Sequence, residues 1–233
     1  MSENINENIL RIRQKISKAA LKSGRRPEDV KLIAAVKKVP VEKIMEAIDA
    51  GVIDIGENRV QDAVVKFSEI GNLAKWHFIG HLQRNKVKYI VPFTEIIHSV
   101  DSFRLAFEIN KQAKKINKIQ KIFLEVNISG EESKFGFSSN EILEKLKEMS
   151  ELKNISIEGL MTLPPMEVEK EAARKFFKRL RDIFENIKIK KIPHVNMSYL
   201  SMGMTNDFEV AIEEGANMVR IGTGIFGFRE VKK

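Results

Sequence analysis

The sequence contains no cysteine. A chain without thiols cannot form a disulfide, use a thiolate nucleophile or hold zinc through sulfur, so these kinds of site are excluded. It has no apolar run near the roughly 18 residues that a membrane-spanning helix needs. Residues 1–8 are polar and acidic, unlike a secretory signal. We therefore expect a cytoplasmic protein that has no contact with the membrane.

Aromatic residues are scarce, at 7% of the chain. The formal net charge of +8 could attract nucleic acid, but the lysine-rich stretches at 111–121 and 188–191 have no interleaved aromatic side chains on which bases could stack. These lysines are typical of solvated helix faces and loops. We expect no nucleic-acid partner.

Short apolar runs alternate with amphipathic stretches along the chain. The runs predict strands at 32–36, 52–55, 76–79, 96–99, 122–128, 157–161, 194–197 and 218–221. Helical patterns lie between many of them, at 41–50, 60–70, 102–113, 140–149, 168–187 and 207–214. This alternation predicts an α/β fold, a (β/α)8 TIM barrel. The alternative is an open doubly wound sheet, which would carry a glycine-rich turn after its first strand, and residues 36–40 contain no glycine.

An amphipathic pattern over residues 5–23 predicts an extra helix before the first strand, and we expect it to plug the bottom of the barrel. No linker, repeat or low-complexity segment divides the chain, so residues 1–233 are expected to form a single domain. Functional side chains of such a barrel gather at the C-terminal ends of the strands. These ends carry Lys37, Asn58, His81 and residues 198–203 and 220–224.

Lys37 ends the first apolar run, shortly before Pro40, which stops a strand from continuing. A lysine at the end of a buried strand is expected to be poorly solvated, which favours the uncharged amine that attacks an aldehyde to form a Schiff base. The alternative is a lysine that only extends from a strand end into water.

The loops after the seventh and eighth strands are where this fold commonly binds phosphate. Ser201 and Gly203 lie ahead of a predicted helix, whose first N–H groups could face an anion. Gly222 and Thr223 form a second turn, where backbone can approach a phosphate and a hydroxyl can donate to it. Each loop alone is more typical of a cap or an ordinary turn. Together with the strand-end lysine, they predict a phosphorylated aldehyde, and pyridoxal 5′-phosphate is the candidate.

Six segments also carry a family resemblance, in order and across essentially the whole chain: AVKKVP at 35–40, DIGENRVQ at 54–61, WHFIGHLQRNK at 76–86, EGLM at 158–161, SMGMTND at 201–207 and VRIGTGIFG at 219–227. They closely resemble the YggS/PROSC family of pyridoxal phosphate homeostasis proteins. The resemblance implies a barrel like the N-terminal domain of alanine racemase, with pyridoxal phosphate on the lysine after the first strand. The family often has Ser or Thr before that lysine, where this chain has Val36.

The resemblance also implies roles for single residues. It places the internal aldimine on Lys37 rather than Lys38 and puts Arg220 near the pyridine nitrogen, with phosphate contacts from Ser201, the backbone of Met202 and Gly203, Gly222 and Thr223. An arginine paired with a carboxylate at the barrel rim is the alternative for Arg220. Asn58 is expected to touch the cofactor or to support Lys37, or else to cap the helix that follows it.

Two other features are weaker. His77 and His81 have the spacing of metal ligands on a helix, but their strand-like context puts them on no common helical face, so we expect no metal. Lys134 resembles part of a family motif on a loop and would contact a ligand transiently, or is simply solvated.

Racemisation needs a base on each face of the substrate, and in alanine racemase one is a tyrosine of a second domain. This chain ends soon after its eighth predicted strand. Tyr89 falls in a helix away from the presumed mouth, and Tyr199 is placed in the phosphate loop, so neither suits an opposite-face base. We therefore expect a non-catalytic carrier, monomeric or weakly dimeric, that hands pyridoxal phosphate to apo-enzymes. The alternative is a minimal amino-acid racemase.

Overall fold

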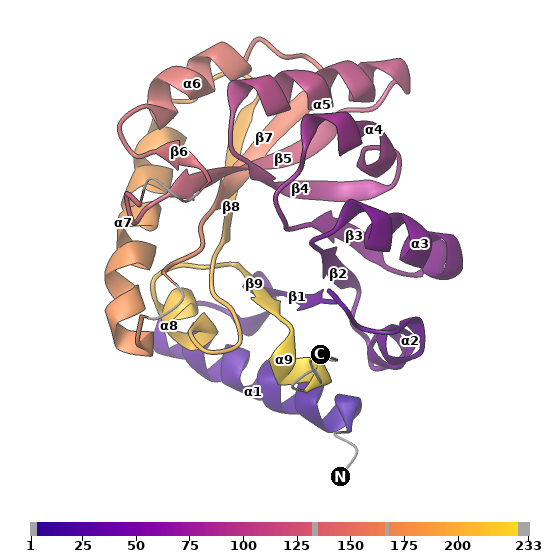
Figure 1. Cartoon of the computed structure of the whole chain (residues 1–233). Coiled ribbons are helices and arrows are strands. Elements are labelled where there is room, and N and C mark those ends of the chain that lie inside the picture. The colour runs from indigo at the N-terminus through magenta and orange to yellow at the C-terminus, as the bar shows by residue number, and fades with distance from the viewer. Residues whose placement is uncertain (1–3, 132–134, 166–167, 228–233) are drawn as a thin grey trace.

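Eight parallel strands form a closed barrel with helices around it (Figure 1). The computed structural model describes residues 4–131, 135–165 and 168–227. The barrel strands are β1 Lys31–Ala35, β2 Asp54–Glu57, β3 Lys75–Phe78, β4 Thr94–Val100, β5 Gln120–Asn127, β7 Ile155–Met161, β8 Val195–Ser201 and β9 Met218–Ile221. Each strand pairs with the next in the order β1-β2-β3-β4-β5-β7-β8-β9, and β9 returns to β1. The predicted (β/α)8 barrel is confirmed.

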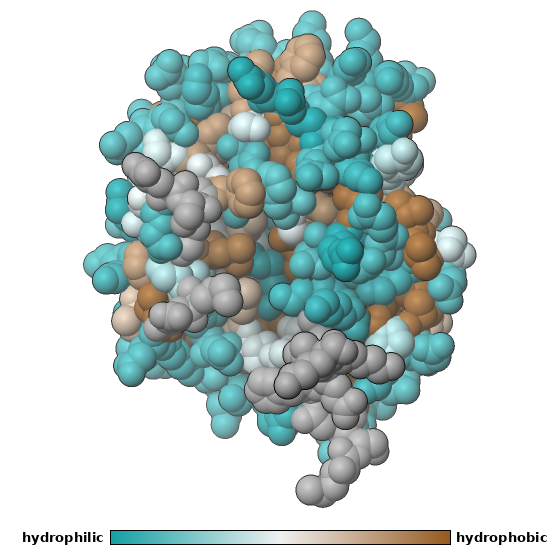
Figure 2. All heavy atoms as spheres, viewed as in Figure 1, coloured by the Kyte–Doolittle hydropathy of each residue, from teal (hydrophilic) through white to brown (hydrophobic). Residues whose placement is uncertain are grey.

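Helices fill the outer layer of the barrel. They are α1 Ile5–Lys22, α2 Val41–Asp49, α3 Val60–Ile70, α4 Val87–Ile90, α5 Phe103–Lys115, α6 Ile142–Met149, α7 Lys170–Ile189, α8 Phe208–Glu213 and α9 Thr223–Phe226. Their apolar faces pack on the outside of the strands. In α5, for example, Ser102 caps the first turn and the buried residues recur at helical spacing. Figure 2 shows that hydrophilic side chains cover most of one face of the molecule, with hydrophobic patches between them.

The N-terminal helix was expected to plug the barrel, and this expectation is wrong. Helix α1 lies in the outer layer, where it packs against α8, α9 and α2 (Figure 1). The side chain of Asn8 donates to the carbonyl of Ile225 at 2.9 Å. The barrel interior is instead filled by strand side chains, as in other TIM barrels. Its apolar cluster consists of Ile33, Ile96, Phe123, Met161 and Met218, with Tyr199 packed against them.

Two strand boundaries differ from the predicted ones in a way that changes the site. Strand β2 extends to Glu57, and β8 extends to Ser201, four residues beyond its predicted end. Ser201 is therefore the last residue of a strand and not part of a loop. Tyr199 lies in β8 as well, with its ring 5.7 Å from that of Phe123, so its placement in the phosphate loop was also wrong. The polar residues of this segment interrupt the apolar pattern: Ser198 is exposed, whereas Tyr199 and Ser201 contact residues of other strands inside the barrel. The short strand β6 (Phe137–Ser138) and the short helix α9 were not predicted, whereas the helix expected at Tyr89 is α4.

No helix within the described residues combines the length and the apolar composition that crossing a membrane requires.

Candidate ligand-binding site

The predicted site residues lie on four neighbouring strands. The barrel order places β2, β1, β9 and β8 side by side, and all of them are parallel. Their C-terminal ends therefore open on the same face of the barrel, which we call the mouth. Lys37 follows β1, Asn58 follows β2, Ser201 ends β8, and Gly222 and Thr223 follow β9.

Lys37 lies in the turn that follows β1, where the N–H of Val39 donates to the carbonyl of Val36 at 3.0 Å. The preceding Val36 is fully buried, whereas the side chain of Lys37 is exposed. The expectation of a poorly solvated lysine is therefore wrong, because the turn directs the chain out of the sheet immediately after Val36. Lys38 is exposed too and adopts a left-handed backbone conformation, with φ of 55°.

A buried ion pair fixes the strand ends on either side of Lys37. The ammonium of Lys66, on α3, donates to Glu57 at 2.7 Å and to the carbonyl of Val36 at 2.7 Å. The other carboxylate oxygen of Glu57 accepts the N–H of Asn58 at 2.8 Å. Lys66 therefore joins the end of β1 to the end of β2 directly before the two candidate site residues.

Sequence reasoning missed Glu57 and Lys66. A signal was available, because Lys66 occupies the buried face of an amphipathic helix with Val60, Ala63 and Ile70. A lysine in such a position requires a buried partner.

Asn58 is not the cap of α3. That position is occupied by Arg59, which makes no side-chain capping bond, so the capping alternative is wrong. The side-chain carbonyl oxygen of Asn58 is buried and has no hydrogen-bond partner within the described part of the chain. The backbone of Asn58 lies against Gly80, where an added Cβ would come within 2.3 Å of the Asn58 carbonyl oxygen. A buried acceptor without a partner costs free energy unless a ligand satisfies it.

Arg220 lies inside the barrel and not at its rim. It is 3% exposed on β9, in register with Ile33 of β1. Its guanidinium donates to the carbonyl of Ser201 at 2.7 Å, to the hydroxyl of Ser201 and to the carbonyl of Thr162 at 3.0 Å. These bonds use three of the five N–H groups of a guanidinium and leave two for another acceptor. Among the described residues, no carboxylate forms a salt bridge with Arg220, so the rim ion pair is not present.

Arg220 nevertheless stays charged. Burial lowers its pKa to about 10, against the opposing influence of Asp207 and Glu125, and this value is still well above neutral pH.

The two expected phosphate loops are joined to each other. The N–H of Arg220 donates to the carbonyl of Gly203 at 3.0 Å, and the hydroxyls of Thr223 and Thr205 share a hydrogen bond of 3.2 Å. Gly203 has φ of 93°, and a Cβ there would lie 2.6 Å from that of Ala211, so only glycine fits. The N–H of Met202 is already bonded to the carbonyl of Met218, so it is not a free donor.

A carboxyl group at the mouth was also missed. Glu125, near the end of β5, is 8% exposed. Burial and the neighbouring charge of Asp101 raise the pKa of Glu125 to about 7, although Arg220 lowers it. Its position in a strand that otherwise reads as apolar is the signal that could have identified it.

The remaining candidates lie elsewhere. His77 is buried in β3 and hydrogen-bonded to Asp54 and His98, whereas His81 is exposed, 3.1 Å from Asp101 and stacked on Phe135. The two histidines do not converge. Lys134 lies outside the described residues.

Residues 2–230 match the family described as alanine racemase, N-terminal domain. A pyridoxal phosphate homeostasis protein of Aquifex aeolicus is 43% identical, and the alignment covers 96% of this chain and 98% of that protein. The structure of PipY from Synechococcus elongatus with PLP bound is 32% identical with a TM-score of 0.81, and the match covers 96% of this chain and all of that one. Alanine racemase of Clostridium difficile shares the fold at 16% identity and a TM-score of 0.73, and this chain spans 58% of its length.

Proposed function

We propose that this chain, which belongs to the alanine racemase N-terminal-domain family and within it to the pyridoxal phosphate homeostasis proteins, binds pyridoxal 5′-phosphate on Lys37 and carries it without catalysing a reaction of its own. One observation supports this best. A lysine amine, an amide oxygen with no partner within the described chain and a guanidinium with spare N–H groups come from the C-terminal ends of three adjacent parallel strands. We infer that residues 1–233 act as one such binding unit.

The donor set of the mouth fits this cofactor. When bound, pyridoxal phosphate supplies an aldehyde that condenses with an amine, a pyridine nitrogen that accepts a hydrogen bond and a phosphate that accepts several. Lys37 would hold the aldehyde carbon, and one of the two free N–H groups of Arg220 would donate to the pyridine nitrogen. Asn58 would accept a hydrogen bond from the hydroxyl on the pyridine ring through its unpaired oxygen.

The phosphate would lie between the loops that follow β8 and β9. Thr223 and Thr205 share one hydrogen bond, so one of their two hydroxyl hydrogens remains free to donate to it. Gly203 and Gly222 would let the backbone approach closely, with Met202 and Ser201 forming the wall on the β8 side.

The proton chemistry of the site favours a carrier. An arginine cannot release its proton, so Arg220 would leave the pyridine nitrogen unprotonated and the ring a weak electron sink. Tyr89 is exposed on α4, and Tyr199 lies in the apolar interior cluster. No tyrosine of the described residues therefore reaches the mouth as a base for the opposite face of a substrate.

We infer a protein free in the cytoplasm, monomeric or weakly dimeric, that passes the cofactor to apo-enzymes. A minimal racemase remains the second candidate only through the shared fold.

Borohydride trapping tests the site. Reduction in the presence of pyridoxal phosphate should fix the label on the peptide that contains Lys37, as read by mass spectrometry. Lys37→Arg should abolish the label, and Lys38→Arg, an exposed neighbour of the same charge, should retain it. A label on Lys38 in the native chain would overturn the assignment.

Two further measurements test the binding mode and the absence of catalysis. Pyridoxal without phosphate should bind far more weakly, because each lost charge-assisted hydrogen bond is worth about 1.5–3 kcal/mol. Solvent deuterium exchange at Cα of a panel of L-amino acids should not exceed that of the free cofactor. Faster exchange would favour the racemase.

A further inference from the structure

A line of polar side chains crosses the interior of the barrel beneath the mouth. Asp54 on β2 contacts His77 on β3, His77 contacts His98 on β4, and His98 contacts Ser201 on β8, each across 2.9 Å. His98 and Ser201 are completely buried, and His77 is 2% exposed. We call Asp54, His77, His98 and Ser201 the interior relay. Its upper end is bonded to Arg220, which we have assigned to the cofactor.

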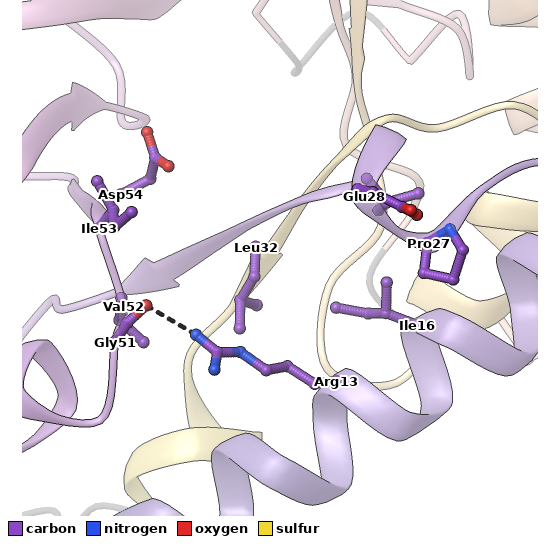
Figure 3. Close-up of a pocket in the computed structure, with 10 residues that line it drawn as sticks. Arg13, Ile16, Pro27, Glu28, Leu32, Gly51, Val52, Ile53 and Asp54 are labelled. Atoms are coloured by element: carbon purple, nitrogen blue, oxygen red, sulfur yellow. Dashed lines mark hydrogen bonds between the residues drawn. The ribbon is translucent and has the colours of Figure 1, made fainter.

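The lower end of the interior relay reaches the opposite face of the barrel. Asp54 is the first residue of β2 and lines a cavity of about 590 Å³ between the strand starts and α1 (Figure 3). Its side chain is 16% exposed. Asp54 can therefore exchange protons with solvent. His77 and His98 are buried and cannot exchange protons with solvent directly.

The hydrogen bonds fix the direction of the relay when both histidines are neutral. A guanidinium only donates, so the hydroxyl oxygen of Ser201 accepts from Arg220. If Ser201 donates its own hydrogen to Nδ1 of His98, then Nε2–H of His98 donates to Nδ1 of His77. Nε2–H of His77 then donates to the carboxylate of Asp54. Every contact is satisfied, and Ser201 has no hydrogen left for a ligand.

Reversing this direction requires one more proton. If Ser201 turns its hydrogen toward a ligand, Nδ1–H of His98 must donate to Ser201, and Nε2 of His98 must accept from Nδ1–H of His77. Nε2 of a neutral His77 would then face the carboxylate of Asp54 at 2.9 Å, with two acceptors in contact. Only a proton added at the His77–Asp54 pair resolves this conflict.

We propose that His77 and His98 are positioning residues that set the direction of the Ser201 hydroxyl, so that an anion which accepts from Ser201 at the mouth draws one proton onto His77 at the far side of the barrel. This inference rests on the proposed function, because it takes the phosphate of the cofactor as the anion. Binding and proton uptake are then linked through the barrel interior.

The surroundings of the relay favour the state in which both histidines are neutral and Ser201 donates its hydrogen to His98. Burial, with His77 and Arg220 nearby, lowers the pKa of His98 well below its usual 6.5. Although burial alone raises the pKa of Asp54, the hydrogen bond and charge of His77 lower it, so that Asp54 stays ionised. The other titratable or charged groups on the strands around the relay are Lys31, Glu57, Lys75, Glu95, Lys121, Glu158, Tyr199 and Arg220, with Glu125 and Asp207 facing Arg220.

Imidazole nitrogen NMR tests the proposal directly. The chain has four histidines, so long-range ¹H–¹⁵N spectra resolve each ring, and His81→Asn and His194→Asn assign the two exposed ones. The probe is 4-deoxypyridoxine 5′-phosphate, which has the ring and phosphate but no aldehyde. At pH 8 its phosphate is already a dianion. We expect both relay histidines to carry hydrogen on Nε2 in the free protein. With the probe bound, His98 should carry it on Nδ1 and His77 on both nitrogens.

Proton counting on the same samples supplies the second readout. Calorimetry in two buffers should give about one proton taken up per probe in the native chain and near zero in Ser201→Ala and Asp54→Asn. Asp101→Asn breaks the comparable pair with His81 and should keep the uptake.

A bound probe with His98 unchanged and no proton uptake would overturn the relay, while borohydride labelling of Lys37 in a separate sample loaded with pyridoxal phosphate would leave the proposed function standing. Failure of the probe to bind together with failure to label Lys37 would overturn both.

Discussion

The interior relay and the mouth are both polar regions of one barrel, but they differ in how far their groups are satisfied. In the relay every contact joins a donor to an acceptor, and the line of side chains ends on the partly exposed carboxylate of Asp54. At the mouth, Asn58 has a buried oxygen without a partner within the described chain, Glu125 holds a proton near neutral pH, and Lys37 is exposed. Satisfied polar groups hold a structure in place, whereas unsatisfied ones mark where a ligand binds.

Arg220 belongs to both regions, and reversing its charge should have the largest effect. Arg220→Glu places a carboxylate against the Ser201 and Thr162 oxygens and leaves them without donors. We expect a loss above about 5 kcal/mol in the free energy of unfolding, enough to unfold many domains. Urea denaturation of this variant and of Arg104→Glu, at an exposed position, measures it. A folded Arg220→Glu protein of native stability would contradict the interior placement of the guanidinium.

The ion pair beneath Lys37 should show the next largest effect. Lys66→Met leaves Glu57 as a buried, uncompensated charge and should cost about 3–5 kcal/mol. Lys66→Met combined with Glu57→Gln removes both charges and should recover part of that loss. The two single variants and the double variant form a cycle that isolates the coupling. Additive effects would mean that the pair does not hold the two strand ends together.

His98, in the interior relay, should make the free energy of unfolding of the protein depend on pH. Its pKa in the folded protein is depressed, so below about pH 6.5 the unfolded chain binds more protons and stability falls as pH falls. His98→Asn removes this dependence. Its destabilisation relative to the native chain should therefore shrink on acidification from pH 6.5, by up to about 1.4 kcal/mol per pH unit. Urea midpoints at pH 7.5, 6.5 and 5.5 measure it, with the exposed His194→Asn as the control variant.

Glu125 at the mouth should make the stability depend on pH with the opposite sign. Its pKa is raised to about 7, so its contribution is present below the unfolded value near 4.3 and is lost as pH rises through about 7. Glu125→Gln keeps the shape without the charge. Relative to the native chain it should gain about 1–2 kcal/mol between pH 5 and pH 8. If the stability difference between Glu125→Gln and the native chain were the same at pH 5 and pH 8, the carboxyl would be ionised at both pH values.

Much of the fold could be predicted because the sequence pattern is local. The period of apolar residues located all eight barrel strands, and the predicted helix 60–70 matches α3 in both bounds. The end of β8 could not be predicted, since Ser198, Tyr199 and Ser201 are polar residues in a strand, and the contacts of Tyr199 and Ser201 come from other strands. The outer position of α1 depends on α8 and α9, which lie about 200 residues later in the chain.

The sequence by itself determined which candidate site residues lie at the C-terminal ends of strands, and parallel strands must present these ends on one face of the barrel. Lys37, Asn58, Thr223 and Arg220 were predicted as site residues in this way. Only the tertiary structure decided the solvation and partners of each group. It made Lys37 exposed, gave Arg220 carbonyl and hydroxyl acceptors in place of a carboxylate, paired Lys66 with Glu57 and connected Asp54 to Ser201 through two histidines. Hydrogen bonds and burial depend on atoms brought together by folding, and residues such as His98 and Ser201 are 103 positions apart along the chain.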